Sequence, residues 1–204
     1  MRRIFIGTLV VLTIALINGC ANRKITRVDP NETIDLSGRW NDSDSRLVSE
    51  EMIGDLLTSA WIPRYLKAND KRPVVVVGLV ENKSHEHINS ETFIKDVEKA
   101  IIRDGNIRLV VAGEKRNELR KERAEQQDYA SPETTKKWGK ELGADFILQG
   151  TINSIVDSYK KQKVVTYQID LQLTNIETNE VVWMGDKKIK KQISDRSAFI
   201  QLRI

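Results

Sequence analysis

The sequence contains few of the residues from which most redox, metal and covalent catalytic sites are built. Its 204 residues include one cysteine, two histidines and four prolines. One cysteine cannot form a disulfide within the chain, nor a cysteine-rich zinc site. The sequence also lacks the motifs of a nucleophile elbow, a phosphate-binding loop and a zinc-protease helix. A disulfide scaffold is therefore excluded, and we expect a protein that is not an enzyme and holds no metal.

The charge balance does not favour a nucleic acid as partner. Lys and Arg number 33 against 29 Asp and Glu, which gives a formal net charge of +4, and Arg2 and Arg3 supply half of it. A nucleic-acid binder usually concentrates its basic residues on one face. A hydrophobic content of 40% with 30% charged residues is typical of a globular protein and excludes a multi-pass membrane protein. We expect one domain with a tail, acting as a monomer.

The first twenty residues have the pattern of a bacterial secretory signal. Two arginines precede an apolar run over residues 4–17, which is shorter than the roughly 20 residues that a spanning helix needs. The run ends in Leu16, Ile17, Asn18, Gly19 and Cys20. This ending resembles the lipobox of bacterial lipoproteins, which implies cleavage before Cys20, a diacylglycerol on its thiol and an N-acyl chain on the new α-amine. A plain signal peptide or an uncleaved anchor is the alternative.

The residue after the cysteine is Ala21 and not aspartate. By resemblance to enterobacterial sorting, this implies delivery to the outer membrane, with the domain facing the periplasm. The polar residues that follow indicate a tether. The expected organisation is a signal peptide over 1–19, a lipidated cysteine and short tether over 20–34, one domain over 35–195 and a C-terminal tail over 196–204.

Hydrophobic spacing predicts an α/β domain in the first two thirds of the mature chain. Candidate N-caps at 42–45 precede apolar residues at helical spacing, so we expect a helix that Pro63 terminates. The β-branched run 74–80 is typical of a strand buried on both faces. A helix from Ser90 to its closing residue Gly105 comes next.

Two further elements complete this part of the chain. A short strand is expected over 107–111. Ser131, Pro132 and an acid in the first turn predict another helix, which Gly143 ends, with Leu142 pointing inward.

The last third predicts an antiparallel meander of three strands. Apolar and polar residues alternate over 146–156 and 165–174, and a third strand follows over 181–193. The meander makes the sheet mixed, with helices flanking it in a single layered domain. The last strand carries Lys187, Lys188, Lys190 and Lys191. These lysines either protect a sheet edge from aggregation or form a basic patch for glycan phosphates or lipid headgroups.

One expected helix, over 114–127, has almost no apolar side chains. Its acidic and basic residues fall on opposite faces, and the basic face carries Arg116, Arg120 and Arg123. A helix of this kind is either a solvated connector or a docking surface.

The two histidines follow the buried strand. His85 and His87, with Glu86 or Glu91, could form a two-nitrogen metal pair, but two ligands make a weak site. We therefore favour an exposed loop that happens to hold both histidines.

Five ungapped blocks of sequence resemble the LpoB-type penicillin-binding protein activators. They lie at residues 37–46, 74–78, 91–96, 140–145 and 173–178. The resemblance extends over 34–193 and implies a fold similar to the N-terminal domain of TolB. It also implies an outer-membrane lipoprotein that binds a class A penicillin-binding protein, a bifunctional peptidoglycan synthase. Such activators stimulate glycosyl transfer and transpeptidation and are not enzymes.

The tether differs from that of the enterobacterial members, which is long and rich in proline. Here about fourteen residues separate Cys20 from the domain, a reach of at most about 50 Å. Either the partner reaches further outward, the periplasm is crossed differently, or the partner is not the usual synthase.

The resemblance offers candidate contact residues that the core pattern does not explain. They are Trp40, Asn41, Asp42, Arg46, Asn82, Glu86 and His87. Tryptophan and arginine are enriched at interface hot spots. Alternatively, Trp40 packs under the first helix and Asp42 merely caps it. A second function, an envelope assembly or secretion accessory on a similar fold, stays open, and an envelope hydrolase is a third class without support from any motif.

We expect Cys20 to be acylated in the cell. An alkyne-labelled fatty acid should be incorporated into the wild-type chain and not into Cys20→Ala, because the chain has no other cysteine to carry the diacylglycerol. Equal labelling of both chains, or none in the wild type, contradicts the lipoprotein prediction. Membrane fractionation of Ala21→Asp tests the expected sorting.

Overall fold

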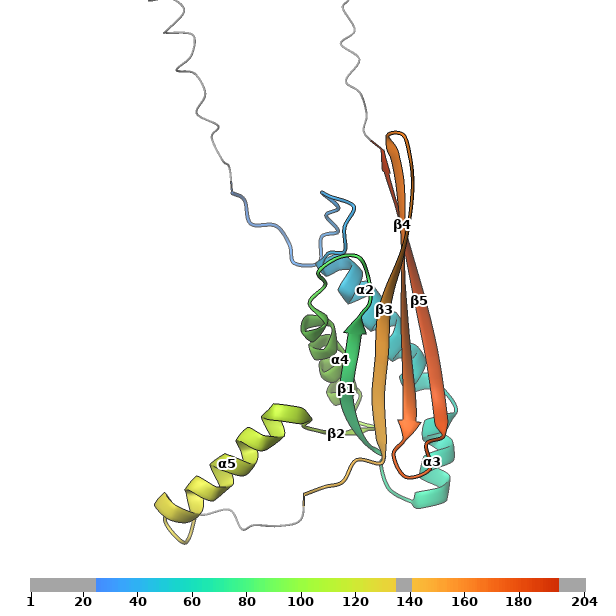
Figure 1. Cartoon of the computed structure of the whole chain (residues 1–204). Coiled ribbons are helices and arrows are strands. Elements are labelled where there is room, and N and C mark those ends of the chain that lie inside the picture. The colour runs from blue at the N-terminus through green and yellow to red at the C-terminus, as the bar shows by residue number, and fades with distance from the viewer. Residues whose placement is uncertain (1–24, 135–140, 195–204) are drawn as a thin grey trace, which may run out of the picture. The chain divides into compact units, whose positions relative to one another are not determined.

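A computed structural model describes residues 25–134 and 141–194, and Figure 1 shows their arrangement. A compact unit begins at Thr33. Its helices and strands, in chain order, are α2 (Asp42–Thr58), α3 (Trp61–Asn69), β1 (Val74–Asn82), α4 (Ser90–Asp104), β2 (Arg108–Val110), α5 (Gly113–Tyr129), β3 (Phe146–Tyr159), β4 (Gln162–Asn175) and β5 (Val181–Ser194). Within the described ranges, every helix is too short or too polar to cross a bilayer.

The five strands form one mixed sheet in the order β2-β1-β3-β4-β5. Strand β1 is parallel to both of its neighbours, β2 and β3. The last three strands are antiparallel, with β3 and β4 paired from Phe146 with Asn175 to Tyr159 with Gln162. The predicted α/β class and the predicted C-terminal meander are both confirmed.

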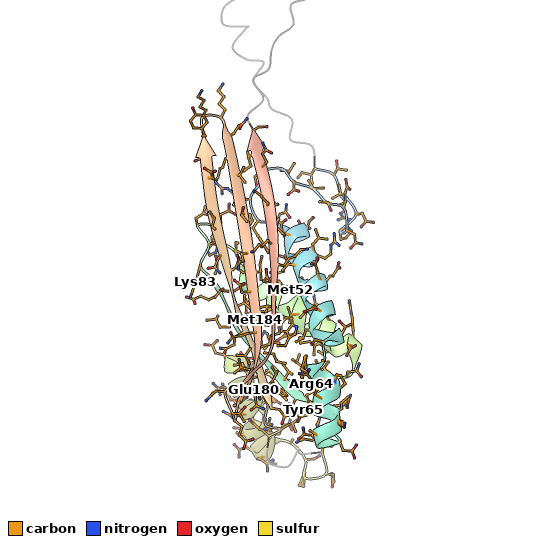
Figure 2. All side chains as sticks on the ribbon, turned by 90° about the vertical axis from the view of Figure 1, so that its right-hand side faces the viewer. Met52, Arg64, Tyr65, Lys83, Glu180 and Met184 are labelled. Carbon is orange, nitrogen blue, oxygen red and sulfur yellow. The ribbon has the colours of Figure 1, made fainter. Side chains whose placement is uncertain are left out.

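The core lies between one face of this sheet and two helices. Every second side chain of β4 is buried from Val165 to Leu173, as the alternation predicts, and the intervening ones are partly exposed. Val48, Met52 and Leu56 of α2 are buried in the same cluster. The apolar side of α4 completes it with Phe93, Val97 and Ile101. Figure 2 shows α2 and α3 along one side of the strands.

Strand β1 begins with four consecutive buried valines, Val74 to Val77, which confirms the predicted strand buried on both faces in its first half. The pairing with β3 shifts between Val77 and Val80, and Leu79 there is 64% exposed. Helix α4 is capped by Asn89 and ends at Gly105, whose φ of 77° is the left-handed conformation that glycine tolerates. Both ends of this helix agree with the prediction.

The end of the first helix was predicted wrongly. Helix α2 already ends at Thr58, and Pro63 lies in the first turn of α3. Proline is tolerated there because the first turn of a helix leaves its N–H groups without intrahelical partners. The indole N–H of Trp61 donates to the carbonyl of Leu56 at 2.9 Å, which satisfies an acceptor at the broken helix end. Its ring packs edge-to-face on Phe146.

Three smaller predictions also differ from the structure. Strand β2 is shorter than expected, since it begins at Arg108. Val156 is 41% exposed and not buried, because β1 ends opposite Ile152 and no longer flanks β3 at this level. Leu142 is 44% exposed and does not point inward. The centre of the helix predicted from Ser131 to Gly143 lies outside the described residues, and 132–134 form a turn.

Two glycines provide a matched test of packing. A Cβ at Gly150 would collide with the Asp170 carbonyl oxygen, whereas a Cβ at Gly54 in α2 would meet open space. We expect Gly150→Ala to lower the free energy of unfolding by about 1–3 kcal/mol. Gly54→Ala should raise it by up to about 1 kcal/mol, since alanine favours a helix interior. Urea denaturation measures both, and a fully stable Gly150→Ala contradicts the register of β3 and β4.

Candidate functional site

Several of the predicted contact residues meet at the N-terminus of α2. We call this cluster the Trp40 corner, and it consists of Asp35, Trp40, Asn41, Asp44, Glu86 and Lys191. The backbone N–H of Trp40 donates to Glu86 Oε2 at 3.1 Å, and its indole N–H donates to Ser45 Oγ at 2.8 Å. The ring meets Tyr167 edge-to-face with 5.4 Å between centroids. Trp40 therefore packs under the first helix, as one of the two interpretations of the sequence expected.

The helix cap in this corner is Asn41. Asn41 Oδ1 accepts the backbone N–H of Asp44 at 3.1 Å, and Asp44 Oδ2 accepts that of Asn41 at 2.9 Å. This reciprocal pair is a capping box. Asp42, which sequence reasoning offered as a cap, is exposed in the first turn of α2. Its carboxylate is thus available on the surface.

Lys191 lies between two carboxylates. Its Nζ is 2.6 Å from Asp35 Oδ1 and 2.6 Å from Asp44 Oδ2, and it donates to the carbonyl of Arg39 at 3.0 Å. The side chains of Lys191 and Asp44 are only 10% and 6% exposed. Burial by itself would lower the pKa of Lys191, but the hydrogen bonds to both carboxylates outweigh it and raise the pKa. The hydrogen bond from Lys191 lowers the pKa of Asp35.

The loop after β1 is held against the corner by side chains. Asn82 Nδ2 donates to the carbonyl of Glu86 at 2.8 Å, and Asn82 Oδ1 accepts from Ser84. His85 Nδ1 lies 2.6 Å from Ser154 Oγ, and its Nε2 lies 3.4 Å from Glu86 Oε1. Both ring nitrogens of His85 are therefore occupied by protein groups.

Tyr167 lies beneath this arrangement, and its side chain is fully buried. Burial raises the pKa of its hydroxyl, and the Glu86 carboxylate raises it further. Among the described residues, this hydroxyl is the buried side-chain polar atom that lacks a well-formed hydrogen bond. The phenol therefore stays neutral beneath the corner.

The structure thus divides the candidate contact residues into two groups. Asn41, Asn82 and Glu86 have internal structural roles, while Asp42 and His87 are exposed. Arg46 is partly exposed and forms an i,i+4 ion pair with Glu50 at 3.6 Å. The described part of the chain contains no cluster of three His, Cys, Asp or Glu side chains that could hold a metal ion.

The arginines of α5 also have partners within the chain. Arg120 binds Glu141 through two hydrogen bonds of 2.9 Å, and Arg123 adds a third at 3.3 Å. Arg116 donates to the carbonyl of Val111 at 2.9 Å. The hydrogen bonds from Arg120 and Arg123, that of Arg120 above all, lower the pKa of Glu141. Helix α5 has no buried residue, as its composition predicts, and its basic side joins it to the segment before β3.

The lysines of the last strand fall on two faces of the sheet. Strand β5 is an edge strand, which agrees with a protective role for its lysines. Lys187 pairs with Glu51 of α2, and Lys191 belongs to the Trp40 corner. Lys188 and Lys190 alternate with them and are exposed.

Two surface hollows were not predicted. A groove of about 320 Å³ lies on the sheet face opposite the helices, between Leu79, Glu81, Asp170 and Met184. A second, of about 350 Å³, is lined by residues that include Arg64, Tyr65 and Glu180, labelled in Figure 2. Each hollow combines residues far apart in the sequence, so no local motif could have revealed it.

The mixed sheet, with helices packed on one face, defines an α/β domain. Ion pairs and a helix cap fix its Trp40 corner. A family model described as "Peptidoglycan-synthase activator LpoB" matches residues 44–189. The chain belongs to the LpoB family, whose members are non-catalytic activators.

Comparison with solved structures finds several similar chains. The LpoB C-terminal domain from Escherichia coli is 19% identical, with a TM-score of 0.41, over 74% of this chain and 99% of that chain. The corresponding domain from Salmonella enterica is 16% identical, with a TM-score of 0.40, over 72% and 98%. Lipoprotein GNA1162 from Neisseria meningitidis is 15% identical, with a TM-score of 0.38, over 62% and 88%. A search of curated proteins finds no match.

Lys191 and Lys187 form a matched pair for testing the corner. Lys191→Met leaves the buried Asp44 carboxylate without its cation, so we expect the free energy of unfolding to fall by about 3 kcal/mol. Lys187→Met removes a pair whose carboxylate is 61% exposed and should cost less than about 1 kcal/mol. Equal losses would contradict the special role of Lys191.

The same variant has a defined pH dependence. The pKa of Asp35 is lowered on folding, so this carboxylate stabilises the fold above pH 3.8. That stabilisation is lost as the pH falls through the lowered pKa. The pKa of Lys191 is raised, so its stabilisation is present below 10.5 and is lost as the pH rises through the raised value. The difference between wild type and Lys191→Met should therefore be largest between these limits in thermal melts.

Proposed function

We propose that this chain is a lipid-anchored envelope protein that binds a class A penicillin-binding protein and activates its peptidoglycan synthesis. The family match over 44–189 carries this proposal. It includes α2 from Asp44 onward, the loop after β1, and the sheet as far as Ile189 in β5. The proposed localisation is the outer membrane, with the domain in the periplasm and the lipid on Cys20 as the anchor.

The mechanism requires no chemistry from the chain itself. An activator shifts its partner toward an active conformation only if it binds that conformation more tightly than the inactive one. A surface held rigidly before binding loses less conformational entropy on association. The Trp40 corner meets this condition, since ion pairs, a capping box and an aromatic contact fix its backbone.

The exposed residues on this corner are the proposed contacts. Asp42 lies in the first turn of α2, Arg46 follows one turn later, and His87 lies in the loop that Glu86 holds against Trp40. They offer a carboxylate, a guanidinium and an imidazole on a fixed backbone. The partner is therefore expected to present complementary charged and hydrogen-bonding groups.

The proposed tether limits where binding takes place. About fourteen residues between Cys20 and the domain extend to at most about 50 Å. The start of the domain then stays within about 50 Å of the lipid anchor, and the synthase must reach the domain there. The proposed domain organisation is a signal over 1–19, a lipidated cysteine and tether over 20–34, the domain over 35–195 and a tail over 196–204.

Reconstitution tests the proposal. Purified chain should raise the rate of glycan polymerisation by a class A synthase from the same cell. Asp42→Ala with His87→Ala should weaken activation at least about tenfold, as expected for loss of hot-spot contacts. The melting temperature should stay unchanged, because both side chains are exposed.

A control pair of exposed residues on other helices, Lys67→Ala with Asp128→Ala, should leave activation intact. Equal loss in both double variants would place the contact elsewhere. No stimulation by the wild-type chain, together with recovery of a secretion component in a pull-down, would favour the envelope assembly function instead.

A further inference from the structure

We propose that the tip of the β3–β4 hairpin is a second membrane contact, one that binds anionic lipid headgroups of the bilayer holding the anchor. The tip is defined as residues 155–164. Its orientation toward that bilayer rests on the proposed lipidation of Cys20, whereas the headgroup contact itself follows from the residues of the tip.

The tip is basic and partly apolar. It carries Lys160, Lys161 and Lys163 against a single carboxylate, Asp157. Ile155 and Tyr159 are 74% and 72% exposed. In Figure 1 the hairpin extends past the end of α2.

This combination fits a bilayer surface. Lysines near an anionic membrane are attracted by its surface potential, and tyrosine is favoured at the headgroup level because its ring is apolar and its hydroxyl is polar. The Lys160 ammonium lies 5.2 Å from the centre of the Tyr159 ring, so the charge and the ring are presented together. An exposed isoleucine favours a lipid over an anionic glycan, since it has no hydrogen-bonding group.

Strand β5 adds two lysines to the sheet face that carries Ile155. Lys190 is paired with Thr166, and Thr166 is paired with Ile155 across the sheet. Paired residues lie on one face, so Lys188 and Lys190 share the face of Ile155 and Tyr159, whereas Lys163, which is paired with Ile193, lies on the other face. Neither forms an ion pair with any described carboxylate, unlike Lys187 and Lys191 on the helix side.

The chain enters the domain at the end where the tip lies. Ser194 is paired with Gln162, so β5 ends beside the tip. A side chain at Gly38 would collide with Ile193, and Asp35 binds Lys191. Residues 35–39 therefore lie next to the end of β5. A proposed tether of about fourteen residues leads from this same end to Cys20, which keeps residue 34 within about 50 Å of the anchored cysteine.

Fluorescent labelling tests the contact at a defined site. Cys20 is the only cysteine, so Ser158→Cys in the mature chain over 20–204, with Cys20→Ala, accepts an environment-sensitive dye at the tip alone. Lys67→Cys in α3, near the other end of the sheet, is the control position. The probes are vesicles of phosphatidylcholine with and without phosphatidylglycerol.

We expect the emission at position 158 to shift to the blue only with phosphatidylglycerol and to return at high salt, since salt screens exposed charges. The label at position 67 should not respond. Lys160→Gln with Lys161→Gln and Lys163→Gln should weaken this response at least about tenfold in apparent affinity. The triple variant Lys67→Gln, Lys99→Gln and Lys121→Gln changes the net charge equally and should have little effect.

Three results would overturn the proposal. They are an equal loss in both triple variants, an equal response to neutral vesicles, or a tip variant that loses binding to isolated peptidoglycan while keeping its binding to vesicles. The chains in this assay are unlipidated, so a failure of the Cys20 prediction leaves the outcome unchanged. Synthase activation is measured without vesicles and can therefore fail independently.

Discussion

A single lysine that is almost closed off from water joins three separate parts of this domain. Lys191 comes from the last strand, Asp44 from the first turn of α2, and Asp35 from the segment that precedes it. The buried Asp44 carboxylate and the half-exposed Asp35 carboxylate would repel each other, and the ammonium between them removes that cost. The position of α2 on the sheet, and with it the position of Trp40, depends on this arrangement. The loop after β1 then depends on Trp40 through Glu86.

The sequence correctly predicted those elements whose pattern of residues lies within one short stretch of chain. The alternation in β4 and the cap and closing glycine of α4 each lie within one element, and the structure agrees with them. The break between α2 and α3 was missed because Trp61 continues the helical spacing of the apolar residues. Its indole satisfies the carbonyl of Leu56 across the break, a contact that hydrophobic spacing does not encode.

The candidate site was predicted only as a set of residues. Trp40 and Glu86 are 46 positions apart, and Lys191 and Asp35 are 156 apart. No local pattern reports that such residues meet. The sequence left open whether Trp40 is a contact or a packed side chain, and its hydrogen bonds and the contact with Tyr167 show that it is packed. The same fixed backbone leaves Asp42 and His87 at the surface.

The length of the antiparallel strands has a consequence for where the far end of the sheet is found. Strand β3 runs fourteen residues from Phe146 to Tyr159, a span of about 45 Å. With Tyr159 at the lipid surface and the strands upright, the aromatic hollow beside Phe146, Arg64 and Tyr65 would stand nearly as far from the bilayer as a fully stretched tether could reach. The rigid sheet would then act as a spacer that leaves the Trp40 corner near the bilayer and holds the aromatic hollow well away from it.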